Sequence, residues 1–318
     1  MINSFPLLFI LTLGKKENLK KEQLYEVSMK RKLIKQGKGG YTITLPIDWV
    51  RDQNLEGGDD LTINTKDSTV TITPDKISIP KREIFIRADK IETSVRTLLA
   101  NAYRAGFDRI HVTYTGDKDM LAEIIQEHLL GFEMLTQKEK NYLIESVAEP
   151  SYDDFETIMQ RQFHIILDII RNIEGSDVQR HAVMIQKYDN FLKRCISKRF
   201  FSPESGPFFW QLISNLTQIS RQCYRLNKIL LKKKKIFSTK EKEYLAEIEK
   251  MFALLQKSYF SKDLSHLMEL HIIQHKLFYE IGPKLLQKNQ EAHYLMYLAR
   301  LIYLANSPLT GYLQIISS

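Results

Sequence analysis

The sequence has few cysteines and no apolar run long enough to span a membrane. Its 318 residues include only two cysteines, Cys195 and Cys223, which lie in separate helical patterns without metal-site spacing. We expect free thiols in a reducing cytosol, which excludes a disulfide framework. The apolar stretch FPLLFILTL near the N-terminus is too short to cross a bilayer. The chain is therefore expected to be cytoplasmic, without membrane insertion.

Residues 1–28 also lack a complete signal-peptide pattern. MINS supplies no basic residue before the apolar stretch, and no small-residue cleavage site follows it. Met29 stands directly before a basic segment. We interpret residues 1–28 as an N-terminal extension or the product of an upstream start codon, with a signal peptide as the alternative.

Catalytic motifs are missing as well. The sequence contains no P-loop, GxGxxG, GxSxG or HExxH, and no spacing that pairs a nucleophile with its base. We expect neither enzymatic activity nor a cofactor. His271 and His275 have a helical spacing that can hold zinc, but no third ligand accompanies them. We interpret the two histidines as a pair on a helix face or at the edge of the core.

Acidic residues are absent from residues 30–47. This segment instead holds five basic residues, in a chain with 46 Lys+Arg, 38 Asp+Glu and a net charge of +8: Lys30, Arg31, Lys32, Lys35 and Lys38. Such a segment indicates an anionic partner, and a solvated strand edge is the alternative. A second run, Lys232–Lys235 with Lys228, lies at a helix end where lysines favour the dipole and solvent. Nucleic-acid contact there is the alternative.

The stretch GKGGYTITLPIDWV, residues 37–50, predicts a strand followed by a short helix. Tyr41, Ile43 and Leu45 alternate with threonines, the pattern of a half-buried strand that ends at Pro46. IDWVRDQN then reads as a helix, and LTINTKDSTVTIT as a hairpin with its turn at residues 66–68. The apolar side chains predicted to point inward are few: Ile34, Ile43, Leu45, Trp49, Leu55, Leu61, Ile63, Val70 and Ile72. So small a core predicts an obligate dimer that shares one core.

Residues 81–149 predict a small α/β unit. Asp89 and Glu92 form a D-x-x-E capping pattern ahead of a helix that stops at Gly106. A strand, DRIHVTYTG, and a helix, DMLAEIIQEHLLG, follow. FEMLT and NYLIESV read as two further strands. The alternation of strands and helices is typical of an α/β layer.

After Pro150 the strand signals nearly vanish. Apolar residues recur three and four apart in six segments: 151–175, 177–200, 207–235, 238–261, 263–287 and 289–317. Ser238 with Glu241 predicts a capping box at the start of the fourth segment. Six helices with short connections predict an antiparallel bundle, or two three-helix halves.

The fold class is therefore α+β and multidomain. The expected parts are residues 1–28 as an extension, 29–80 as a small β domain, 81–149 as an α/β linker domain and 150–318 as an all-α bundle. Basic charge concentrates in the second part.

The segment from Arg31 to Pro74 carries the landmarks GGYTITLP, Trp49-Val50, LEGGDDL and TVTITP. In these it resembles the swapped-hairpin DNA-binding domain of the AbrB/SpoVT/MazE class. The order of the whole chain resembles the archaeal phosphate uptake regulators, which join an AbrB-like domain to a PhoU-like helical domain. The C-terminal likeness rests on the helical layout alone.

The resemblance implies a cytoplasmic homodimer whose interleaved hairpins bind DNA. The residues that match the family's basic positions and flexible loop are Arg31, Lys32, Lys35, Lys38, Gly39, Gly40, Tyr41, Thr42 and Arg51. Their chemistry agrees, because lysine and arginine neutralise phosphates and glycines let backbone N–H groups approach them.

PhoU-like bundles often carry E/D-x-x-x-D motifs that bind metal ions on paired helices. Here Thr217 and Arg221 occupy the expected acidic positions in LTQISRQCY, and Asp189 is followed by Lys193 in KYDNFLKR. A cationic side chain in place of a ligand repels a metal ion. We expect no family-type metal cluster.

The leading hypothesis is a DNA-binding transcription regulator linked to phosphate uptake. The alternative is a PhoU-like adaptor that binds a phosphate transporter or a sensor protein, with the N-terminal domain mainly a dimeriser. The charge pattern of residues 30–47 favours the regulator. An antitoxin role is disfavoured, because a helical bundle stands where such proteins append a short tail.

Overall fold

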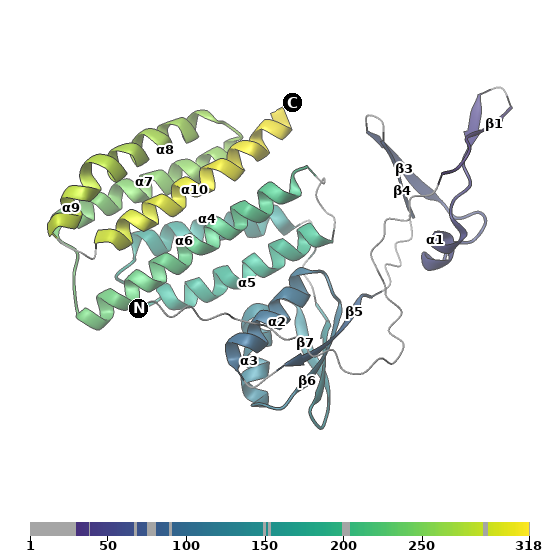
Figure 1. The fold of residues 1–318 in the computed structure, drawn as a ribbon, viewed down its shortest axis with the longest axis horizontal. Helices are drawn as coiled ribbons and strands as arrows, with labels where there is room; N and C mark the ends of the chain where they lie inside the picture. The colour runs from purple at the N-terminus through teal and green to yellow at the C-terminus, as the bar shows by residue number, and fades with distance from the viewer. Residues whose placement is uncertain are drawn as a thin grey trace, which may run out of the picture. The chain divides into compact units, whose positions relative to one another are not determined.

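The computed structural model describes residues 30–37, 39–66, 69–74, 81–88, 91–148, 151, 154–198, 204–288 and 292–317. The expected extension, residues 1–28, lies outside them. The chain divides into two compact units, Met1–Pro80 and Lys81–Ser318, described separately below (Figure 1). Small sheets and a large helical region make the fold α+β.

The first unit contains two hairpins and a short helix. Strand β1 (Ile34–Gln36) pairs antiparallel with β2 (Gly40–Thr42). Helix α1 (Ile47–Asp52) follows, and β3 (Leu61–Lys66) pairs antiparallel with β4 (Thr69–Pro74). The predicted order of elements is thus observed, although Asp67 and Ser68 of the predicted turn lie outside the described residues.

The predicted strand through Leu45 is wrong in its extent. β2 ends at Thr42, and residues 43–46 have no strand pairing. Pro46, which has no N–H to give to a ladder, is the extended N-cap residue of α1 rather than part of its first turn. The helix also ends at Asp52, two residues earlier than predicted.

The predicted inward side chains of the first unit are not buried in this chain. Four are more than half exposed: Ile34 at 52%, Ile43 at 52%, Ile63 at 61% and Val70 at 60%. The other five are half-buried: Leu45, Trp49, Leu55, Leu61 and Ile72. The reason is physical, since each hairpin is a two-stranded layer and a buried face needs a second layer against it.

The second unit begins with a four-stranded sheet in the order β5-β6-β8-β7. Its strands are β5 (Glu83–Ala88), β6 (Arg109–Tyr114), β7 (Phe132–Lys138) and β8 (Asn141–Ser146). β5 and β6 are parallel and the other pairs are antiparallel. Strand β5 was not predicted, because its apolar face is only two isoleucines and an alanine beside an exposed Phe85.

Helix α2 (Glu92–Arg104) crosses between the two parallel strands, and α3 (Lys118–His128) connects β6 to β7. The predicted cap of α2 is wrong: the N-cap residue is Ile91, without a side-chain hydrogen bond, and Asp89 lies outside the described residues. Gly106 stops the helix as predicted, with a φ of 86° that other residues rarely adopt.

The six helical segments predicted for the bundle are present as seven α-helices among the described residues, because the fifth segment, residues 263–287, is divided in two. They are α4 (Phe155–Arg171), α5 (Val178–Ser197), α6 (Gly206–Lys233), α7 (Thr239–Ser261), α8 (Ser265–His275), α9 (Gly282–Lys288) and α10 (Ala292–Ser317). Helices α4, α5 and α6 pack together, as do α7, α8 and α10. The two sets meet along α6 and α10 and share one hydrophobic core (Figure 1).

Helices α2 and α3 also pack on α5, so the sheet and the bundle belong to one compact unit. The capping box of α7 is confirmed, because Ser238 accepts from Glu241 N–H and the Glu241 carboxylate accepts from Ser238 N–H. Both cysteines are buried free thiols. In the described part of the chain, each helix is too short or too polar to cross a bilayer.

A π-helical turn, Lys276–Ile281, joins α8 to α9. The N–H of Gly282 donates to the carbonyl of Leu277, and a Cβ on Gly282 would meet that oxygen at 2.7 Å. Pro283 follows, and a proline ring crowds the carbonyl four residues earlier in a regular α-helix. The π-helical turn, which is wider than an α-helical turn, lies where a regular helix would bring the proline ring against that carbonyl.

Candidate nucleic-acid interface

The basic segment of the first unit is exposed. Lys30, Arg31, Lys32 and Lys35 are all exposed, and none forms an ion pair within the described residues. Lys35 stands opposite Tyr41 in the β1–β2 ladder. These side chains are therefore accessible to a partner. Lys38 lies outside the described residues.

The turn between β1 and β2 depends on glycine. Gly37 has a φ of 57°, in the left-handed region, and a Cβ on Gly40 would lie 3.3 Å from the carbonyl of Gln36. Thr42, expected to contact DNA, places its hydroxyl 3.5 Å from the carbonyl of Ile34, at the limit of a hydrogen bond. Its oxygen therefore remains able to accept from or donate to a partner.

Arg51 is exposed in the last turn of α1. Five acidic residues follow the basic hairpin between positions 48 and 60: Asp48, Asp52, Glu56, Asp59 and Asp60. All five are exposed, and the Asp59 carboxylate accepts from the Glu56 N–H at 2.7 Å within the loop. The β1–β2 hairpin thus carries positive charge without acidic neighbours in its own segment.

The four residues compared with the metal-binding motif, Asp189 and the altered positions Lys193, Thr217 and Arg221, lie close together in the second unit. Asp189 on α5 is 1% exposed, and its carboxylate accepts from Lys193 Nζ at 2.7 Å and from Thr217 Oγ1 at 2.9 Å. Arg221 lies one helical turn beyond Thr217 on α6 and bonds to Gln186. Burial lowers the pKa of Lys193, and its contact with Asp189 opposes that shift.

Arg104 at the end of α2 completes this cluster. Its guanidinium bonds to Asp189 Oδ2 at 3.0 Å and to Asn190 Oδ1 at 2.8 Å. The Asn190 amide donates in turn to the carbonyl of His128 at 2.8 Å. One buried carboxylate therefore joins α2, α5 and α6.

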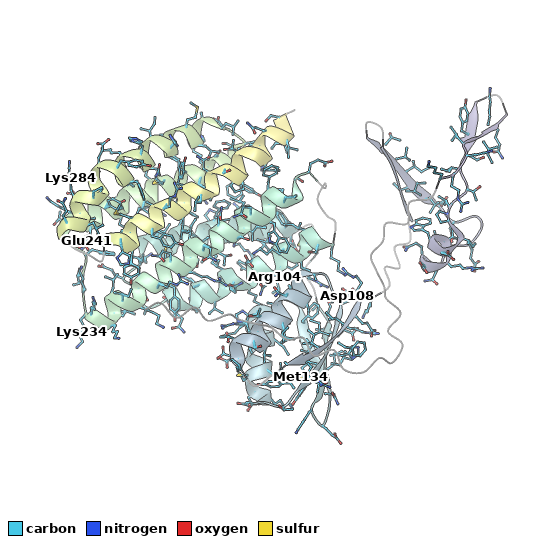
Figure 2. The ribbon with its side chains drawn as sticks, viewed as in Figure 1. Arg104, Asp108, Met134, Lys234, Glu241 and Lys284 are labelled. Carbon is cyan, nitrogen blue, oxygen red and sulfur yellow. The ribbon has the colours of Figure 1, made fainter. Side chains whose placement is uncertain are left out.

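Arg194, one turn along α5 from Asn190, makes the second link between helix and sheet. It donates to the carbonyls of Tyr103 at 3.0 Å and Phe107 at 2.8 Å, and to Asp108 Oδ1 at 2.7 Å. Burial raises the pKa of Asp108, but bonds from Lys198 and the Arg82 N–H outweigh it, so the pKa falls below its usual value. Figure 2 labels Arg104 and Asp108 at this junction.

Sequence reasoning missed Arg104 and Arg194. Arg194 stands three residues after the buried Phe191 and next to the buried Cys195, so it occupies an apolar phase of α5. A cationic residue at a position on the apolar face of a helix is the sequence signal that could have indicated a buried ion pair. The partners are 85 to 91 residues away and follow only from the fold.

The histidine pair and the lysine run, which were the remaining candidate sites, contact neighbouring protein side chains. His271 and His275 are exposed and lie against the rings of Tyr303 and Tyr279. Across the described ranges, no group of three or more histidine, cysteine, aspartate or glutamate side chains could hold a metal ion. In the lysine run, Lys234 is the left-handed C-cap of α6 and Lys235 lies 3.4 Å from Glu241.

Comparison with known proteins gives no match: no family model, no curated protein and no solved structure is similar to this chain.

Proposed function

We propose that the protein is a dimeric DNA-binding transcription regulator, linked to phosphate uptake. The observation that carries the proposal is the basic hairpin: exposed cations around β1, a glycine turn beside them, and no acidic residue from position 30 to 47. Lysine and arginine in such an arrangement bind phosphates and release counterions. The backbone N–H groups of a glycine turn approach phosphates closely.

The exposed apolar side chains of the first unit support a homodimer. Ile34, Ile43, Ile63 and Val70 expose more than half of their surface, although they alternate as core residues do. Interleaving two such units would give each hairpin its missing second layer. We propose an AbrB-like swapped-hairpin arrangement on this ground. It would place two basic hairpins on one dimer, as a duplex with two half-sites requires.

For the helices we propose a PhoU-like bundle with a dimerising or sensing role. Its two three-helix sets and one shared core support this. The link to phosphate uptake rests on the resemblance of chain order alone.

The test is binding of the full chain to a labelled duplex from the region upstream of its own gene, titrated with salt. Arg31, Lys35 and Lys38 are changed together to alanine. If each neutralises one phosphate, the slope of log K against log salt becomes shallower by about 3 per chain. The matched control changes Lys240, Lys242 and Lys284 to alanine, the same loss of charge on exposed positions of the second unit.

The proposal stands if the wild type prefers this duplex to a scrambled one and only the hairpin variant loses affinity. The proposal is overturned if the wild type binds weakly and without sequence preference, and if the hairpin variant binds with the same affinity. The adaptor that binds a transporter or sensor protein would then replace it. A third variant, Lys228, Lys232 and Lys233 to alanine, tests the lysine run separately.

A further inference from the structure

The second unit contains a cavity of about 640 Å³, lined by α2, α3, α5 and α6. Its volume falls in the range of small-molecule sites, about 300 to 1,000 Å³. The cavity lies beside the Asp189 cluster, and Arg104 and Asn190 belong to both. It is separate from the basic hairpin, which belongs to the first unit.

Four arginines line this cavity: Arg96, Arg104, Arg221 and Arg225. Only two carboxylates, Glu123 and Glu127, line it with them. Arg104 is held by Asp189, and Arg96 by Glu92 at 3.3 Å. Arg221 bonds to the neutral Gln186, and Arg225 has no ion pair or hydrogen bond within the described residues. Two positive charges therefore line the cavity without an ion pair to a carboxylate in the part of the chain that the structure describes.

The arginines act on one another. The pKa of Arg221 is lowered, first by desolvation and then by Arg104, Arg225 and Arg96, while Asp189 opposes the shift. Such mutual repulsion is a cost to the folded chain, and a bound anion would relieve it.

His128, the last residue of α3, is the second observation. The side chain lines the cavity and is 6% exposed, and its Nδ1 has no hydrogen-bond partner in the described part of the chain. Desolvation lowers its pKa to about 4, and Arg96, Arg104, Lys187 and Arg221 add to this shift. A buried ring nitrogen without a partner is costly, and a ligand oxygen would satisfy it when the nitrogen carries the proton.

We propose that this cavity binds a small multivalent phosphate anion, such as pyrophosphate or the phosphate chain of a nucleotide. Arginine forks match phosphate oxygens bidentately, which suits the unpaired Arg221 and Arg225. A single inorganic phosphate would leave most of the volume empty. Ala100, Ala182, Val183 and the Tyr224 ring add apolar wall, which suits an organic portion of the ligand.

The test is isothermal titration calorimetry of the full chain with sodium pyrophosphate and with ATP, without divalent metal and at constant ionic strength. We expect one site per chain. Arg221→Gln with Arg225→Gln should weaken binding about 100-fold, since each charged hydrogen bond is worth about tenfold. Both side chains are exposed and their mutual repulsion disappears, so the variant should fold with a thermal midpoint no lower than that of the wild type.

Arg161→Gln with Lys257→Gln is the matched control, because both are exposed, lie outside the cavity and remove the same charge. The control should bind as the wild type does. A second readout is the NMR titration of the His128 ring, assigned with His128→Gln, whose pKa should rise when pyrophosphate is present.

The proposal is overturned if neither pyrophosphate nor ATP binds, or if the control loses as much affinity as the arginine variant. It is also overturned if the binding of a DNA duplex is weakened by changing Arg221 and Arg225 while the binding of pyrophosphate and of ATP is not. Tighter binding of ATP than of pyrophosphate would identify a nucleotide, and the reverse an inorganic polyphosphate. The hairpin variant should bind both anions like the wild type, so this test and the DNA test fail independently.

Discussion

Thr217 on α6 donates its hydroxyl hydrogen to the carboxylate of Asp189 on α5, across 2.9 Å and out of contact with water. The same carboxylate accepts from Lys193 and Arg104. It is the acceptor on which three elements converge, and its single negative charge is shared between the buried Lys193 and the partly exposed Arg104.

Asp189→Asn should therefore destabilise the second unit strongly. The substitution keeps the shape but leaves the buried Lys193 without its counter-charge, which costs about 3 to 5 kcal/mol. Urea unfolding followed by circular dichroism measures the change. Asp177→Asn is the control, since its contact with Arg180 is 4.0 Å and exposed, and it should cost less than about 1 kcal/mol. Equal effects of the two substitutions would contradict the expectation.

Arg194→Met should detach the sheet from the bundle. The substitution preserves volume but removes the donor to the Phe107 carbonyl and one of the donors to Asp108 and to the Tyr103 carbonyl. We expect a loss of about 3 to 5 kcal/mol and faster amide exchange in α2 and β6 than in α7. Arg171→Met, at the exposed pair with Glu249, is the matched control. Uniform exchange across the unit would show that Arg194 does not act at this junction.

His128 should make the second unit less stable in mild acid. Its folded-state pKa of about 4 lies below the unfolded value of 6.5, so the unfolded chain binds the proton more readily. The contribution of the neutral His128 ring to the free energy of unfolding is complete above pH 6.5. It declines as the pH falls toward 4, by about 3 kcal/mol in total. Urea unfolding between pH 7.5 and 4.5 measures this, and the slope against pH should be shallower in His128→Gln. A slope unchanged by the substitution would assign the acid sensitivity elsewhere.

Ile63→Asp should weaken the proposed dimer of the first unit. The side chain is 61% exposed in one chain, so a charge there costs little in a monomer but is desolvated in a shared core. We expect dissociation to become at least about 30-fold easier in sedimentation velocity, equivalent to about 2 kcal/mol. Ile63→Val keeps the apolar surface and should dimerise normally. If the Ile63→Asp variant associates like the wild type, the dimer contact lies outside this hairpin.

Gly282→Ala should strain the π turn. Its Cβ would lie 2.7 Å from the Leu277 carbonyl oxygen, a backbone atom that cannot rotate away. We expect a loss of about 1 to 3 kcal/mol and a lower thermal midpoint. Gly206→Ala, whose Cβ would lie 3.4 Å from the Ile196 Cγ2 methyl, an ordinary van der Waals distance, should be neutral or stabilising.

The parts of the fold that follow from the sequence are those with local signals. Ser238 and Glu241 form the predicted capping box because both partners lie within four residues. Thr217 and Lys193 were recognised as altered positions of the metal-binding motif, yet their contacts with Asp189 were not foreseen, and the Thr217 contact depends on how α5 and α6 pack. The apolar faces of the first unit were predicted as buried because apolar and polar residues alternate along its strands. Such alternation shows which face can be buried, but burial also requires a second layer to cover that face.

The π turn between α8 and α9 contains one residue more than an α-helical turn needs. The side chains on either side nevertheless stay in the core, since Leu270, Leu277 and Leu285 are all buried. A helix that carries a surplus residue in this way keeps its packing on both sides while its length changes. Deleting a single residue here would restore regular helical spacing, but it would also bring the Pro283 ring against a carbonyl of the preceding turn, so the surplus residue is what lets the helix continue through the proline.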